Sequence, residues 1–155
     1  MLTTLRDELH QRKPFPSVYE EAALNIVRTM TMLNDAGEDL FKPHGITATQ
    51  YNVLRILRGA EPTGLYRNEL RDRLLTRMPD VTRLLDRMER SGLVVRTRGN
   101  DDRRLVSTRI TTAGMELVNS LDAPVAELHQ RQLGHLSVQE LRSLIDTLTR
   151  VRNAP

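Results

Sequence analysis

Gly92-Leu93-Val94-Val95-Arg96 is followed by Asp102-Arg103-Arg104 and then by Ile110-Thr111-Thr112-Ala113-Gly114. A glycine that ends a helix, apolar residues after it and a charged turn predict a strand and a return strand. The two strands form a ribbon that carries arginines at its tip and is attached to the end of a helix. This is the outline of a winged helix, and its arginine-tipped wing indicates nucleic-acid phosphate or a minor groove as the partner.

Two short helices joined by a brief turn precede this ribbon. Residues 67–74 form the first, and the second begins near Pro79, which suits the first turn of a helix. Apolar residues at i, i+3, i+4 and i+7 predict a buried stripe on the second helix. The stripe consists of Val81, Leu84, Leu85 and Met88, and the other face carries Asp80, Thr82, Arg83, Asp86, Arg87 and Arg90. Such a pair of helices is typical of a helix-turn-helix.

Further helical segments flank this central region. A short helix is expected within residues 3–12 and a long one over residues 18–44. Capping boxes at residues 47–50 and 137–140 each open another helix. Leu65 is expected to begin a minimal strand beside the wing.

The length of 155 residues suits one domain. We therefore predict a mainly α-helical fold with a small β-wing, in a single chain over residues 1–155. Its winged helix-turn-helix DNA-binding region covers residues 46–110, and residues 1–45 and 111–155 supply dimerisation helices.

The terminal helices have more apolar surface than one small winged-helix core can cover. A two-fold homodimer would use this surface, so we predict an interface in these helices. Its predicted side chains are Leu117, Leu121, Leu141, Leu144, Ile145 and Leu148. The alternative is a packed monomeric helical bundle.

Charge is distributed unevenly along the chain. The net charge is +3, but residues 67–109 hold 12 arginines against 7 acidic residues, a balance of +5 that leaves −2 for the remainder. A basic middle between near-neutral ends indicates a nucleic-acid-binding face. The alternative is a charged helix face that is only solvated.

Several function classes are disfavoured by composition. The chain has no cysteine, which excludes disulfides and thiolate metal sites. No apolar run approaches the ~18 residues that span a bilayer, and the N-terminus lacks signal-peptide order, so we expect a cytoplasmic protein with no membrane partner. No catalytic grouping or phosphate loop is recognisable, which argues against an enzyme and indicates no cofactor. The four histidines are dispersed, so no metal site is predicted.

The order of these elements resembles the multiple-antibiotic-resistance regulator (MarR) family of bacterial winged-helix transcription factors. The resemblance covers residues 17–152 and is most specific over residues 81–96, 102–104 and 110–114. It implies an obligate homodimer that binds double-stranded DNA at a palindromic operator and is often released by a small-molecule effector. The expected function is a ligand-responsive transcriptional repressor. The alternative is a winged-helix protein-interaction module without specific DNA binding.

Exposed donors in the N-terminal half of a recognition helix reach base edges in the major groove. Arg83 suits a bidentate contact to guanine and Thr82 a base or phosphate contact, whereas Arg77 and Arg87 suit phosphates. The alternative for Arg83 and Arg87 is an intrahelical ion pair with a neighbouring aspartate such as Asp80.

The wing supplies the other expected DNA contacts. The resemblance implies that Arg104 occupies the position that inserts into the minor groove and that Asp102 is its acidic companion. Arg98 and Arg103 are assigned to phosphates. Asp102 is equally suited to forming the turn itself.

In relatives of the family, ligands lie between the long first helix, the second helix and the base of the winged domain. The side chains expected there are Met30, Phe41, His44, Tyr51 and Arg55. Each also has a plain interpretation as a core or surface residue.

Overall fold

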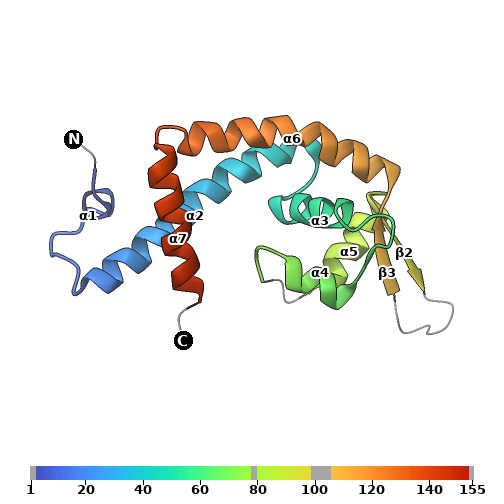
Figure 1. The fold of residues 1–155 in the computed structure, drawn as a ribbon, viewed down its shortest axis with the longest axis horizontal. Coiled ribbons are helices and arrows are strands. Elements are labelled where there is room, and N and C mark those ends of the chain that lie inside the picture. Colours follow the sequence, from blue (N-terminus) through green and yellow to red (C-terminus); the bar gives the residue numbers. More distant parts are fainter. Residues whose placement is uncertain (1–2, 78–79, 99–105, 154–155) are drawn as a thin grey trace.

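The computed structural model describes residues 3–77, 80–98 and 106–153. Its helices are α1 (Leu5–Glu8), α2 (Val18–Phe41), the 3-10 helix η1 (Lys42–His44), α3 (Ala48–Arg58), α4 (Arg67–Arg73), α5 (Val81–Arg90), α6 (Thr112–Leu133) and α7 (Val138–Arg152). Its strands are β1 (Leu65–Tyr66), β2 (Val94–Arg98) and β3 (Val106–Ile110) (Figure 1). The mainly helical fold with a small β-wing is confirmed.

The elements separate into two ends of an elongated molecule. Figure 1 shows α3, α4, α5 and the sheet gathered at one end, α1 and α7 at the other, and α6 running between them. The antiparallel sheet has the order β1-β3-β2, with Leu65 opposite Thr108 and Val94 opposite Ile110. The minimal strand expected at Leu65 therefore completes the wing.

Side-chain caps define where the helices begin. The Thr47 backbone N–H donates to Gln50 Oε1 over 2.9 Å, and the Gln50 N–H donates to Thr47 Oγ1 over 3.2 Å, which forms the expected capping box of α3. Asp80 differs from the expectation. It precedes α5 as the N-cap, where its Oδ1 accepts from the Arg83 N–H at 2.9 Å, so it does not lie on the exposed face of the helix.

Close packing at the base of the wing explains the Thr-Thr-Ala-Gly sequence. The Thr111 side chain caps α6 by accepting from the Gly114 N–H at 3.1 Å, and it donates to the Gly92 carbonyl oxygen at 2.6 Å. A Cβ atom on Gly114 would lie 2.3 Å from the Leu93 carbonyl oxygen, so only glycine fits there. Gly92 has a φ of +73°, the left-handed conformation expected where α5 ends.

The hydrophobic core extends beyond the region expected to form the winged helix. The predicted stripe on α5 is buried, and it packs in one cluster with residues of α3, α4 and α6: Leu54, Leu57, Leu70, Val118 and Leu121. Leu121 is fully buried in this core and Leu117 packs against it. Both were predicted to lie in a dimer interface. That prediction is wrong for Leu121, because its side chain is fully covered within its own chain. Leu117 is only partly buried against the same core, so its place in an interface stays a prediction.

The terminal helices α2 and α7, by contrast, leave their apolar side chains largely exposed. Phe41 is the only residue of the 24 in α2 that is buried, and none of the 15 residues of α7 is buried. Side chains such as Met30 and Ile145 are 51% and 63% exposed. An apolar groove of about 790 Å³ lies between α2, α6 and α7. Within the described part of the chain, no helix combines the length and apolarity that crossing a membrane requires.

Candidate nucleic-acid interface

Helix α5 presents the polar face that the sequence predicts. Thr82, Arg83 and Arg87 are exposed, while the apolar stripe of the same helix faces the core. Arg83 Nε lies 3.7 Å from Asp80 Oδ2, and the Arg83 side chain is 79% exposed. The alternative ion pair is therefore present, but a long, solvated pair contributes at most about 1 kcal/mol and leaves the guanidinium available.

Further arginines lie on either side of α5. Arg77 is exposed in the segment before the helix, and Arg98 is exposed at the end of β2. Together with Arg83 and Arg87 they supply positive charge from the helix, the preceding turn and the wing. Three residues assigned to the wing tip fall outside the described residues: Asp102, Arg103 and Arg104.

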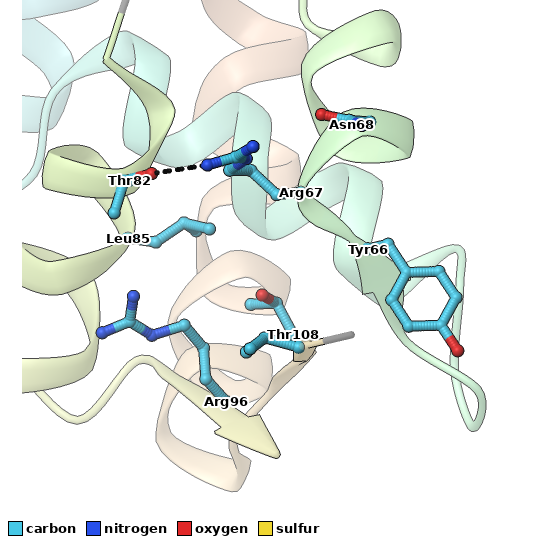
Figure 2. A pocket seen from close by; sticks show the side chains of 8 residues that line it. Tyr66, Arg67, Asn68, Thr82, Leu85, Arg96 and Thr108 are labelled. Carbon is cyan, nitrogen blue, oxygen red and sulfur yellow. Dashed lines mark hydrogen bonds between the residues drawn. The ribbon is translucent and has the colours of Figure 1, made fainter. Parts of the chain in front are cut away.

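A cleft of about 270 Å³ separates α5 from α4 and the wing. Figure 2 shows Thr82 and Leu85 of α5 on one side, Arg96 and Thr108 of the strands below, and Arg67 reaching toward Thr82. Arg67 Nη1 donates to Thr82 Oγ1 over 3.5 Å, a long hydrogen bond. Arg67 was not predicted as a site residue, because nothing in the local pattern indicates that the first residue of α4 faces a residue fifteen positions later.

Arg96 makes the densest set of polar contacts near α5. Its Nη2 lies 2.6 Å from Asp86 Oδ1 and 2.6 Å from Glu89 Oε2. Its backbone N–H also donates to Glu89 Oε1 over 2.9 Å. The hydrogen bond from the Arg96 side chain holds the pKa of the Glu89 carboxyl below its usual range. Arg96 was not predicted as a site residue. The signal was available in two carboxylates three positions apart on one helix face, followed by an arginine in the adjoining strand.

The side chains expected to bind an effector do not come together in one cavity. The Phe41 and Tyr51 rings stack in the core with centroids 4.6 Å apart, and burial raises the pKa of the Tyr51 hydroxyl. His44 and Arg55 are exposed. Met30 lies instead in the groove between α2, α6 and α7. For Phe41 and Tyr51 the plain interpretation as core residues is the one the structure shows.

Titratable side chains give no metal centre in the part of the chain that the structure describes, where no group of three or more His, Cys, Asp or Glu residues could hold an ion.

A three-stranded wing, a helix-turn-helix and an exposed arginine-bearing second helix define a winged helix-turn-helix DNA-binding protein. A family model described as the MarR family matches residues 44–105. A MarR transcription factor from Planctomyces limnophilus has a similar structure, with 41% identity, coverage of 88% of this chain and 98% of that chain, and a TM-score of 0.69. The chain belongs to the MarR family.

Two other relatives extend the comparison. The uncharacterized HTH-type transcriptional regulator YdgJ of Bacillus subtilis is 30% identical over 109 residues, which span 70% of this chain and 65% of the relative. A mutant of MarR from Escherichia coli, complexed with operator DNA, is 26% identical, with coverage of 90% of this chain and 99% of that chain and a TM-score of 0.77. The chain is thus a DNA-binding transcription regulator and not an enzyme. The alternative of an interaction module without DNA binding is set aside.

Proposed function

We propose that this chain is a homodimeric, ligand-responsive repressor that acts in the cytoplasm on a palindromic operator. One observation carries the proposal: the molecule exposes a basic recognition helix at one end and uncovered apolar helices at the other. The first surface suits DNA, and the second suits another copy of the chain.

The dimer is proposed from the state of α2 and α7. A helix with an apolar face is normally stabilised by burying that face, yet these two helices leave theirs exposed within one chain. The expectation of a packed monomeric bundle does not describe this arrangement. The proposed interface keeps four residues that border the groove: Leu141, Leu144, Ile145 and Leu148. A two-fold interface of this kind presents two recognition helices, which explains why the operator should be palindromic.

The proposed DNA contacts divide into base reading and positioning. Arg83 and Thr82 enter the major groove, where Arg83 reads a guanine edge. Arg77, Arg87 and Arg98 bind phosphates from flanking positions. The wing tip adds Arg103 and Arg104, the second in the minor groove with Asp102 beside it, as the family resemblance implies.

Repression is proposed by analogy with relatives. The homoprotocatechuate degradative operon repressor of Escherichia coli is 28% identical, over 70% of this chain and 72% of the relative. Response to a small-molecule effector follows from the family resemblance. Met30 stays a candidate ligand contact on the family resemblance alone, because the groove that it borders is the one assigned above to the second copy of the chain. His44, at the end of η1, and Arg55, in α3, stay candidates because their side chains are exposed.

Selection of DNA by the purified full chain tests the proposal. The protein is incubated with a pool of randomised duplexes, the bound duplexes are sequenced, and sedimentation at micromolar concentration gives the oligomeric state. We expect an inverted repeat with half-sites one helical turn apart, about 34–36 Å, and a dimer. Enrichment of a single unrepeated site by a monomer would contradict the proposal. Full retention of specific binding in the Arg83→Ala variant would contradict the assigned recognition helix.

A further inference from the structure

Arg96 lies halfway along β2, where it is opposite Thr108 of β3. Its side chain leaves the sheet and reaches α5, as Figure 2 shows, instead of pointing to solvent. It is only 23% exposed, and its guanidinium contacts carboxylates of both Asp86 and Glu89. One residue of the wing is thus bound to two residues on a single face of the recognition helix.

The geometry makes this contact stiffer than an ordinary surface ion pair. The Arg96 Nε and Nη2 atoms both donate to Glu89 Oε2, over 3.0 Å and 2.6 Å, while its backbone N–H donates to the other oxygen of the same carboxylate. Because the Glu89 carboxylate binds both the backbone and the side chain of Arg96, β2 has little freedom to rotate relative to α5. A planar guanidinium provides this fork and an ammonium does not.

The position along the strand decides what the contact controls. The hairpin is already joined to the end of α5 at its base, where Thr111 bonds to Gly92. Arg96 adds a second attachment further along β2, two residues before the exposed Arg98. Pairing with β1 holds β3 on one side of the hairpin, and the Arg96 contact fixes the orientation of β2, on the other side, relative to α5.

The same contact also changes the charge that α5 presents. The helix carries Arg83, Arg87 and Arg90 against Asp86 and Glu89, a net charge of one. The guanidinium of Arg96 raises the net charge of this cluster to two and covers the carboxylates. Uncovered carboxylates would face a phosphate backbone that repels them.

We propose that Arg96 is a positioning residue that locks the wing to the recognition helix, so that both meet the DNA as one rigid unit. The inference rests on the proposed DNA contacts of Arg83 and Arg98. It assigns Arg96 no contact with DNA of its own. Replacing Arg96 should therefore change how much Arg98 of the wing contributes to DNA affinity, and not which base Arg83 reads.

A double-mutant cycle tests the proposal with the duplex that the full chain selects from a randomised pool. In the wild-type background we expect Arg98→Ala to weaken binding about fivefold and to lower the slope of log affinity against log salt by about one. In the Arg96→Gln background the wing is no longer held in a fixed orientation relative to α5, so Arg98→Ala should change the affinity for DNA by less than about twofold. Arg83→Ala should weaken binding by the same factor in both backgrounds.

Two further variants distinguish the proposed positioning of the wing from a loss of folding in Arg96→Gln and from a direct interaction between Arg96 and Arg98. Asp86→Asn with Glu89→Gln removes the attachment from the helix side, away from Arg98, and should reproduce the result of Arg96→Gln even if that variant folds poorly. Arg109→Gln is the matched control. Arg109 forms an equally short ion pair, 2.6 Å to Glu61, but it joins β3 to the loop before β1 and not to α5. In that background Arg98→Ala should keep its full effect.

Each remaining outcome has one meaning. Equal effects of Arg98→Ala in all backgrounds, with Arg83→Ala still weakening binding, would overturn the positioning role and leave the proposed function intact. No effect of Arg98→Ala in the wild type would also overturn it, because there would be no wing contact to aim. Loss of the Arg83→Ala effect would instead refute the proposed recognition helix.

Discussion

Replacing Arg83 with alanine separates the two interactions that the structure offers this side chain. In the free protein the guanidinium lies 3.7 Å from Asp80 Oδ2 and is largely solvated, so the pair contributes only ~0.3–0.5 kcal/mol. A bidentate contact to guanine is worth ~1–3 kcal/mol. The free energy gained from the base contact therefore exceeds the free energy lost when Arg83 breaks its ion pair with Asp80.

The expected loss of operator affinity in Arg83→Ala is about 5- to 150-fold per half-site, from the same ~1–3 kcal/mol. The fold should be unaffected, because the N-cap of α5 uses the backbone N–H of residue 83, which bonds to Asp80 Oδ1 at 2.9 Å whatever the side chain. We expect the free energy of unfolding to stay within about 0.5 kcal/mol of the wild-type value.

Fluorescence anisotropy against a set of duplexes with each half-site position altered in turn measures this prediction. Arg83→Ala should lose discrimination at one position per half-site, whereas Arg83→Lys should keep the charge and the salt dependence but lose the same discrimination. Arg131→Ala, an exposed arginine near the end of α6, is the control and should bind like the wild type. A uniform loss across all positions, or affinity within twofold of the wild type, would refute base reading by Arg83.

Three further predictions concern assembly, packing and pH. Ile145→Glu places a charge on the uncovered apolar face of α7 and should shift the sedimentation profile from dimer to monomer, whereas an unchanged dimer would exclude this face from the interface. Gly114→Ala forces a Cβ to within 2.3 Å of the Leu93 carbonyl oxygen and should lower the free energy of unfolding by about 1–3 kcal/mol in urea titration; unchanged stability would show that this contact is not tight. The hydrogen bond from Arg96 holds the pKa of Glu89 below its ordinary value of 4.5. The ionised Glu89 carboxylate therefore stabilises the folded protein fully above pH 4.5, and this contribution is lost as the pH falls through the lowered pKa. Glu89→Gln should therefore reduce the dependence of stability on pH below 4.5, as measured by thermal unfolding, and an identical acid profile in both proteins would disprove the contribution.

The sequence was sufficient for features set by neighbours in the chain. The stripe of Val81, Leu84, Leu85 and Met88 predicted the buried face of α5, and Thr47 with Gln50 predicted where α3 begins. Helical periodicity and capping depend on residues three or four positions apart, so they are legible without knowledge of the fold.

Tertiary structure alone decided what each apolar or charged face meets. The sequence analysis assigned both Leu121 and Leu144 to a dimer interface, but packing buries Leu121 in the winged-helix core and leaves Leu144 exposed. Likewise, the fold brings Arg67 to Thr82 across fifteen positions and Arg96 to the carboxylates of α5. Such contacts depend on how whole elements cross in space. A local pattern predicts that a side chain is buried or paired, whereas the tertiary structure determines which residues it contacts.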